Sequence, residues 1–405
     1  MINSLLSPQV QSFIAQHLDD DVNQLLLKYK TVNDVPISLI VDQIVGRKKA
    51  FEKIPTWSHQ ELIVYPPGVN VEQCSSEKAA TIKTDLVKDQ LGLNIGSKSM
   101  VDLTGGFGVD SFFFSKIFKE VHFVEPNANL LEIAKHNHRQ LGATNIHYYN
   151  TKAEAFLISD SIKKNFDLIY IDPSRRSSGN QKIFSLNQCE PNIIALQPEI
   201  WKAGKTLLLK TSPLLDISAG LNDLQFVKKV CVTAIHNECK ELLFYCEKNF
   251  QSEPIIDAVN LNAEKFSFSF SISAERDTKI TYSDPLKFVY EPNAALLKSG
   301  AFKTIASLFN IYKLHPNTHL YTSDHIVPDF PGRIFEIESF LKSDPKIILK
   351  AFDSGRANIF VRNYPLTVNE IRKKTGLNEG GDKFLIGCSG ISKKFLMVGS
   401  RLNRL

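Results

Sequence analysis

The sequence predicts an α/β protein with a doubly wound, seven-stranded, Rossmann-like sheet, an N-terminal helical region and a small α+β C-terminal module. One observation is the alternation of strand-like apolar runs with helical stretches such as 129–140, which is typical of a parallel sheet. A second is the short link 236–240 between the last two runs, which has no room for a helical crossover and predicts an antiparallel pair. The strand-like runs are 99–104, 121–125, 146–150, 166–172, 206–211, 230–235 and 241–246.

The segments before this sheet indicate helices. Within residues 1–60, isoleucines and valines between Ile37 and Val45 recur at the spacing of one buried helix face. A Pro-Pro-Gly break at 66–68 precedes a predicted helix from 78 to about 91, whose first turn a serine hydroxyl can cap.

Beyond residue 250 the pattern changes. Phenylalanine and serine alternate over 266–271, as in a half-exposed strand, and 292–313 indicates a helix pair or one helix with a glycine break at Gly300. The C-terminal part predicts a small α+β module, with strands at 333–338, 346–351, 357–362, 383–387 and 394–398 and a helix at 367–374. The expected divisions of the chain are 1–70, 71–250, 265–328 and 329–405.

The composition is that of a globular protein, with 43% hydrophobic and 22% charged residues. No basic stretch followed by an apolar run opens the chain, and no run reaches the ~18 apolar residues of a membrane span. The six cysteines form no CxxC pair. The histidine pairs His136/His138 and His315/His319 lack an evident third ligand. We therefore expect a cytoplasmic protein without a bound metal or a membrane partner.

A glycine-rich turn, Asp-Leu-Thr-Gly-Gly-Phe-Gly-Val-Asp, follows the first strand of the sheet at 102–110. The chain must turn sharply here and pass close to a ligand, which a Cβ atom would obstruct. Asp102 can stabilise this turn or meet an amino group of the ligand. A purely structural turn is the alternative, and a dinucleotide-binding GxGxxG would need a third glycine where Ser111 stands. The candidate ligand contacts are Asp102, Thr104, Gly105, Gly106, Gly108 and Asp110.

Two further segments complete a predicted nucleoside site. Glu125 ends the next apolar run, 23 residues after Asp102, and a carboxylate there can accept hydrogen bonds from both hydroxyls of a ribose. A solvated strand-end carboxylate is the alternative. Ala153 and Glu154 stand where a loop backbone and a polar side chain can hold an adenine, although Glu154 can instead be a helix N-terminal charge.

An Asp-Pro-Ser-Arg-Arg motif follows the fourth strand and is the most specific of all. The carboxylate of Asp172, or a neighbouring carbonyl, can accept a hydrogen bond from an exocyclic amine and orient its nitrogen lone pair, while Pro173 fixes the backbone. Arg175 and Arg176 suit phosphate contacts, and Lys210, at the end of the fifth strand, can line the substrate pocket. A proline turn with two solvated arginines and a packed strand terminus are the alternatives.

Taken in order, these motifs predict a methyltransferase that uses S-adenosylmethionine. Methyl transfer is a direct displacement, so alignment and proximity supply much of the acceleration and no activated nucleophile is required. Two alternatives stay open. One is an RNA-binding assembly factor that keeps the fold without turnover. The other is an NAD-dependent oxidoreductase, which the missing third glycine and the antiparallel last hairpin disfavour.

At these motifs the chain resembles class I S-adenosylmethionine-dependent methyltransferases, and most closely a bacterial group with a THUMP-like C-terminal domain. The resemblance spans most of the chain and includes the segments 72–76, 102–110, 172–176 and 291–296. It implies a methyltransferase domain at 71–250, a ferredoxin-like segment at 265–328 and a THUMP-like domain at 329–405. Thr104 replaces the first glycine of the usual D-x-G-x-G-x-G loop. Ser174-Arg175 stands where amine-methylating enzymes carry proline and an aromatic residue, which leaves the acceptor atom open.

The resemblance also implies an RNA substrate, because THUMP modules accompany RNA-modifying enzymes. The charge distribution agrees with this: residues 331–405 hold 14 Lys/Arg and 7 Asp/Glu, and such an excess of positive charge can attract a phosphate backbone. An ordinary solvated surface is the alternative. We therefore expect methylation of a base, at a nitrogen, in ribosomal or transfer RNA, with a protein acceptor as a further possibility.

Overall fold

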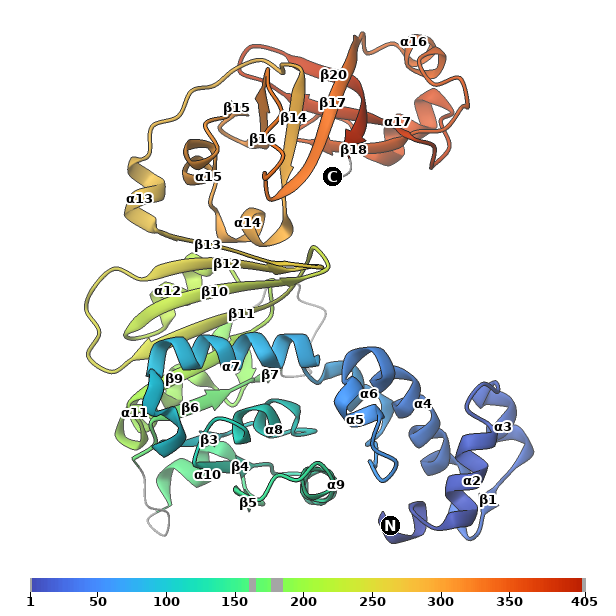
Figure 1. The fold of residues 1–405 in the computed structure, drawn as a ribbon, viewed down its shortest axis with the longest axis vertical. Helices are drawn as coiled ribbons and strands as arrows, with labels where there is room; N and C mark the ends of the chain where they lie inside the picture. The colour runs from blue at the N-terminus through green and yellow to red at the C-terminus, as the bar shows by residue number, and fades with distance from the viewer. Residues whose placement is uncertain (1, 160–164, 176–184, 403–405) are drawn as a thin grey trace. The chain divides into compact units, whose positions relative to one another are not determined.

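The computed structural model describes residues 2–159, 165–175 and 185–402 (Figure 1). The described chain forms two compact units. Unit 1 comprises Met1–Thr233 and Lys240–Ser252, and unit 2 comprises Ala234–Cys239 and Glu253–Leu405. None of the described helices combines the length and the apolar character needed to cross a membrane.

Unit 1 is built on the predicted doubly wound sheet, and all seven expected strands are present. Their order is β10-β11-β9-β6-β3-β4-β5, with β3, β4, β5, β6 and β9 parallel and β11 antiparallel to β9. β10 and β11 are neighbours joined by residues 236–237 alone, so the antiparallel pair expected from the short link is confirmed. The bounds are β3 (Ser99–Asp102), β4 (Glu120–Val124), β5 (Ile146–Tyr149), β6 (Leu168–Ile171), β9 (Thr206–Thr211), β10 (Val227–Ile235) and β11 (Glu238–Glu247).

The strand order continues past β10 with β12 (Ile255–Leu261) and β13 (Lys265–Ser271), which makes nine strands among the described residues. The sequence predicted only seven. The end of β10 and the hairpin of β12 and β13 both belong to unit 2. Just after β10, His236 N–H donates to the Leu261 carbonyl at the end of β12, at 2.9 Å. The alternation predicted over 266–271 is confirmed as β13.

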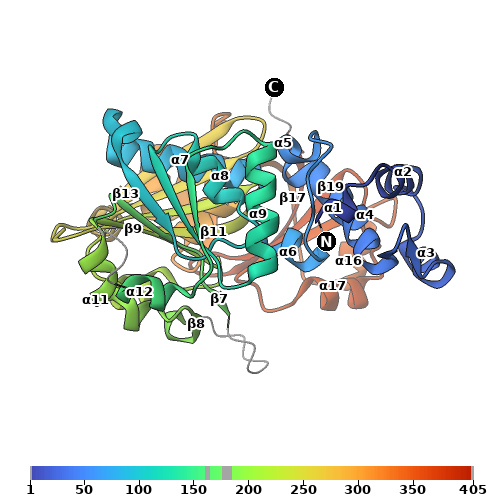
Figure 2. The same cartoon turned by 90° about the horizontal axis from the view of Figure 1, so that it is seen from below.

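Helices cover both faces of the unit 1 sheet, as a doubly wound fold requires. Figure 2 shows α7, α8 and α9 on one face and α11 and α12 on the other, while α10 contacts α11. Polar side chains fix several helix starts; Ser76, for example, accepts a hydrogen bond from Ala79 N–H at the start of α7. The bounds are α7 (Glu77–Leu91), α8 (Val109–Ser115), α9 (Ala128–Gln140), α10 (Ala153–Ile158), α11 (Ile193–Ala203) and α12 (Ile217–Asp223).

The N-terminal helices pack against α8 and α9 of the same unit. The expected helix face around 37–45 is buried in α4, and the Trp57 ring lies edge-on to His138, with 5.9 Å between ring centroids. Asn137 exchanges two hydrogen bonds with the backbone of Val64, at 2.9 and 2.8 Å. The bounds are α1 (Ile2–Leu5), α2 (Pro8–Gln16), α3 (Val22–Lys28), β1 (Thr31–Val32), β2 (Val35–Pro36), α4 (Ile37–Lys53), α5 (Pro55–Ser58) and α6 (Gly68–Gln73).

Unit 2 contains a second, seven-stranded sheet in the order β15-β16-β14-β17-β20-β19-β18. The sheet curls, which brings its edge strand β18 near β16. Asn363, next to β18, donates a hydrogen bond to Thr318 on β16 at 3.2 Å. The strands are β14 (Phe288–Pro292), β15 (Tyr312–His315), β16 (Thr318–Ser323), β17 (Gly332–Leu341), β18 (Asn358–Arg362), β19 (Lys383–Ser389) and β20 (Lys394–Leu402). The helices are α13 (Ile272–Asp277), α14 (Ala294–Ser299), α15 (Lys303–Leu308), α16 (Pro345–Lys350) and α17 (Val368–Thr375).

One predicted element of unit 2 is wrong. The run 346–351 was expected to be a strand, but it forms helix α16. The Asp344 carboxylate caps this helix by accepting from Lys346 N–H at 2.9 Å and Ile347 N–H at 3.1 Å, and Pro345 occupies its first turn. These start signals outweigh the apolar run that suggested a strand.

Candidate active site

A cavity of about 800 Å³ lies at the carboxyl ends of β3, β4, β6 and β9 in unit 1. Every sequence-predicted contact whose side chain is described lines it: Asp102, Thr104, Gly105, Gly106, Gly108, Asp110, Glu125, Ala153, Glu154, Asp172, Pro173 and Lys210. Residues from five segments of the chain thus converge on one space. Arg176 lies outside the described residues, and only the backbone of Arg175 is described, in β7 (Ser174–Arg175), paired with β8 (Cys189–Glu190).

The glycine turn brings the backbone to the cavity. Gly106 has φ +56°, and a Cβ atom added there would meet only the Thr104 carbonyl oxygen, at 3.8 Å, so the space beside it is open. Gly108 has φ +90° and precedes α8, and a Cβ there would lie 2.5 Å from His138 Nε2. The first glycine leaves room for a ligand, and the second permits close packing of the turn against α9.

The carboxylates of Asp102 and Glu125 both accept hydrogen bonds from this turn. Asp102, only 1% exposed, accepts hydrogen bonds from Thr104 N–H at 3.0 Å and from the Ser111 hydroxyl at 2.6 Å. Glu125, 8% exposed, accepts from Gly106 N–H at 2.9 Å and from Asn127 N–H at 2.8 Å. Each carboxylate oxygen of Glu125 has a second lone pair, so it can also accept from a ligand hydroxyl.

The buried carboxyl group of Asp102 should give the protein a measurable pH dependence. Burial raises its pKa from 3.8 to about 7, although hydrogen bonds from Ser111 and Thr104 lower it. The folded state then holds this proton more tightly than the unfolded state, so its contribution to stability is lost as pH rises through about 7.

We expect Asp102→Asn to remove this dependence. Urea titrations give the free energy of unfolding of wild type minus that of Asp102→Asn. This difference should be lower at pH 8 than at pH 5, because the buried carboxyl of the wild type is charged at pH 8 and mostly protonated at pH 5. A difference that is the same at both pH values would contradict this account.

The Asp-Pro corner is tied both to the glycine turn and to β9. The Asp172 N–H donates to Thr104 Oγ1 at 2.7 Å, and Lys210 Nζ lies 2.5 Å from Asp172 Oδ2. Burial lowers the pKa of Lys210, but the charge of Asp172 and of two further carboxylates outweighs this and raises it, so Lys210 stays a cation. The Asp172 side chain is 34% exposed and borders the cavity, whereas Pro173 is buried.

A buried ionic network that the sequence analysis missed lies beside these residues. Lys83 on α7 is fully buried, with Nζ 3.0 Å from Ser75 Oγ, 3.2 Å from Asp110 Oδ1 and 3.1 Å from Glu241 Oε2. The Tyr170 hydroxyl donates to Asp110 Oδ2 at 2.7 Å. A sequence signal existed: Lys83 occupies the apolar stripe of its helix, where an unpaired lysine would be costly.

The two carboxyl groups of this network differ in the direction of their pKa shifts. Burial favours the neutral form of Asp110, but Lys83 and Lys210 more than offset it, so the pKa of Asp110 is lowered. For Glu241 burial prevails over the same two lysines and the pKa is raised. Of these residues, Asp110 and Lys210 line the cavity, and Lys83 lies between Asp110 and Glu241 behind them.

The remaining predicted contacts lie at the start of α10. Ala153 is buried and Glu154 is exposed, and both line the cavity. Among the described residues no group of three or more histidine, cysteine, aspartate or glutamate side chains is placed to hold a metal ion.

Three family models match parts of the chain: "Conserved hypothetical protein 95" at residues 83–192, a ferredoxin-like domain at 288–331 and a THUMP domain-like model at 332–401. No curated protein matches. A solved structure titled "putative methyltransferase" from Porphyromonas gingivalis W83 is 29% identical, with 97% of this chain and 98% of that chain covered and a TM-score of 0.84.

Two more distant solved structures cover less of the chain. A "putative methyltransferase" from Streptococcus mutans in complex with SAH is 15% identical over 40% of this chain and 96% of that chain, with a TM-score of 0.30. An "rRNA Methylase" from Streptococcus thermophilus is 14% identical over 38% of this chain and 87% of that chain, with a TM-score of 0.28. The near-complete match to the P. gingivalis structure, together with the two family models in this order, shows a methyltransferase-like domain followed by a THUMP-like C-terminal domain.

Proposed function

We propose that this protein transfers a methyl group from S-adenosylmethionine to a base of structured RNA, at a nitrogen atom. The observation that carries the proposal is the single cavity where the glycine turn, Glu125 and the Asp172-Pro173 corner meet. An open α/β sheet binds its ligand at this edge, and the likeness to a putative methyltransferase structure supports this class of chemistry.

The residues present fit a nucleoside cofactor. The open space beside Gly106 lets a ligand approach the backbone, and Glu125 has lone pairs for ribose hydroxyls. Ala153 and Glu154 would border the adenine, and Asp102, Thr104, Gly105, Gly108 and Asp110 would shape the rest of the cradle. When bound, S-adenosylmethionine supplies an electrophilic methyl group on its sulfonium.

Asp172 is suited to orient the acceptor. Lys210 holds one carboxylate oxygen, Oδ2, which leaves Oδ1 to accept a hydrogen bond from an exocyclic amine at the cavity rim. The bond from Asp172 N–H to Thr104 Oγ1 fixes this corner relative to the cofactor turn, and correct placement of the two reactants is the main source of acceleration in a displacement. We further propose that Arg175 and Arg176 contact phosphate and that Lys210 acts on the substrate through Asp172.

RNA is the proposed acceptor because of unit 2. Its THUMP-like segment lies within residues 331–405, which hold the excess of basic residues, and a positive surface favours a polyanionic partner. An RNA-binding factor without turnover and an NAD-dependent oxidoreductase are the competing functions. The first would bind RNA without transferring a methyl group, and the second would bind NAD.

Calorimetry tests the cofactor half of the proposal. We expect S-adenosylmethionine to bind and NAD not to. Glu125→Gln should weaken S-adenosylmethionine binding by about ten- to a hundredfold, because hydrogen bonds to a charged acceptor are worth about 1.5–3 kcal/mol. Glu132→Gln, at an exposed position of α9, is the matched control and should bind like wild type. Tight NAD binding without a response to S-adenosylmethionine would reject the proposal.

A further inference from the structure

Three charged side chains meet at one end of the curled sheet of unit 2. Glu291 lies on β14, Arg333 on β17 and Arg362 at the end of β18. Arg333 Nε donates to Glu291 Oε2 at 2.5 Å, and Arg362 pairs with the other carboxylate oxygen, Oε1. Glu291 opens the Glu-Pro-Asn-Ala-Ala-Leu segment of the sequence, to which the proposed methyl transfer gives no role.

The fold builds this cluster from distant strands. Glu291 and Arg333 are direct partners across the antiparallel β14–β17 pair. Gly332 permits this pairing, since a Cβ atom there would lie 1.9 Å from the Glu291 carbonyl oxygen. Arg362 reaches the same carboxylate only because the sheet curls and returns β18, its edge strand, to β14.

Aromatic rings support both guanidinium groups. The carbon of the Arg333 guanidinium lies 5.1 Å from the ring centroid of Phe360, and that of Arg362 lies 5.8 Å from the same ring. Phe360 belongs to the apolar core on this face of the sheet. The ring, the carboxylate and the strands therefore restrict the orientation of both guanidinium groups.

The exposure of the three side chains is unequal. The Glu291 side chain is 4% exposed, whereas those of Arg333 and Arg362 are 32% and 39% exposed. Two cations share one carboxylate, and the structure gives neither arginine a second acidic partner within the described part of the chain. A guanidinium has five N–H donors, so the cluster offers one surplus positive charge and unused donors to solvent.

We infer that Arg333 and Arg362 form a binding site for a backbone phosphate of the RNA substrate, with Glu291 as the residue that positions them. The inference rests on the proposed function for the identity of the ligand. Guanidinium pairs recognise phosphate oxygens through parallel N–H···O bonds, and their orientation before binding reduces the entropy lost on association. A purely structural ion cluster is the competing explanation, and it makes a different prediction for the carboxylate.

The inference is tested by measuring RNA binding to the protein by filter retention between 50 and 200 mM salt. The probe is total RNA from a strain that lacks the gene. Arg333→Gln and Arg362→Gln should each weaken binding about three- to tenfold and reduce the slope of log affinity against log salt by about one. Each variant leaves Glu291 paired with the other arginine, so both should fold. Glu291→Gln should also weaken binding, because it loses the carboxylate that orients both guanidinium groups, whereas a purely structural ion cluster predicts RNA binding like that of wild type.

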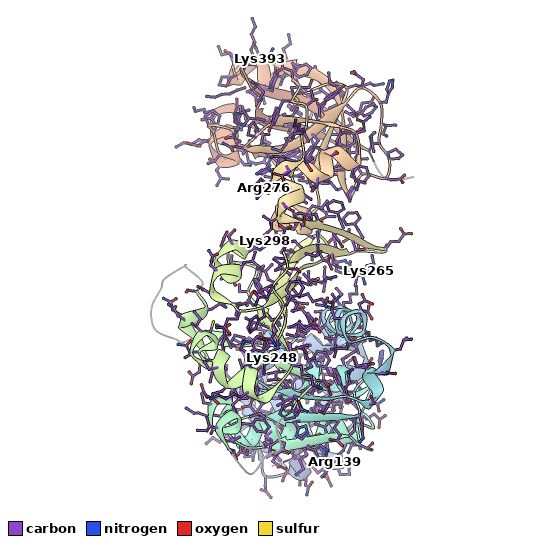
Figure 3. The ribbon with its side chains drawn as sticks, turned by 90° about the vertical axis from the view of Figure 1, so that its left-hand side faces the viewer. Arg139, Lys248, Lys265, Arg276, Lys298 and Lys393 are labelled. Atoms are coloured by element: carbon purple, nitrogen blue, oxygen red, sulfur yellow. The ribbon has the colours of Figure 1, made fainter. Side chains whose placement is uncertain are left out.

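Arg276→Gln is the matched control, because it makes the same change of charge in unit 2 at a side chain that is 70% exposed on α13 (Figure 3). It should bind RNA like wild type. If the Arg333 and Arg362 variants match this control while wild type binds RNA, the phosphate site is wrong and the proposed function stands. If wild type binds no RNA, both are wrong. Thermal melts check that every variant is folded. If Glu291→Gln is unfolded, RNA binding by the Arg333 and Arg362 variants decides whether the phosphate site exists.

Discussion

Replacing Asp172 by alanine is expected to lower the rate of methyl transfer about a hundredfold or more, since misplacement of a reacting group by about 1 Å can cost that much. The affinity for S-adenosylmethionine should stay nearly intact. The reason is that the side chain borders the acceptor rim, while the contact of this residue with the cofactor turn is made by its backbone N–H to Thr104. Single-turnover kinetics and calorimetry on the same preparation measure the two effects separately.

Asp172→Asn is the informative companion. It keeps a carbonyl acceptor in the same place but loses the charge that pairs with Lys210, so it should retain more activity than Asp172→Ala. An equal loss of transfer and of cofactor affinity in the alanine variant would assign Asp172 to cofactor binding and contradict its role in orienting the acceptor.

Lys83→Met is expected to destabilise unit 1 by about 3–5 kcal/mol, the usual cost of removing one partner from a buried ion pair. The change leaves Asp110 and Glu241 buried without the cation that lies 3.2 and 3.1 Å from them. Urea unfolding followed by circular dichroism measures the loss.

Lys88→Met, at an exposed position of the same helix, is the control and should change the free energy of unfolding by no more than about 0.5 kcal/mol. The cost of Lys83→Met should shrink at acid pH, where the carboxyl groups become neutral and no longer need a cation. If the two methionine variants were equally stable at pH 7, Lys83 would not be the cation on which the network depends.

The sequence predicted the sheet and the convergence of the candidate residues because both depend on short segments. Each strand of a parallel sheet ends at the same edge, so the polar residues that follow β3, β4 and β6 had to converge there. The Asp-Pro corner and the glycine turn were identified for this reason. Their hydrogen bond through Thr104 depends on side-chain geometry and could not be predicted.

The ionic network and the arginine cluster were beyond the sequence for a different physical reason. Lys83 meets Glu241 through contacts between elements far apart in the chain, and a lysine in an apolar stripe shows only that some partner must exist. Arg362 reaches Glu291 because a sheet curls, which no local pattern encodes. The wrong strand at 346–351 has a local cause, since the apolar run indicates a strand while Asp344 and Pro345, just before it, start a helix.

The central claim is tested most directly by incubating total RNA from a strain that lacks the gene with the purified protein and S-adenosylmethionine labelled in its methyl group. The account predicts label in RNA, located on a base after nuclease digestion, and incorporation slowed about a hundredfold or more with Asp172→Ala. Label in protein alone, or no transfer by a preparation that binds the cofactor, would contradict it.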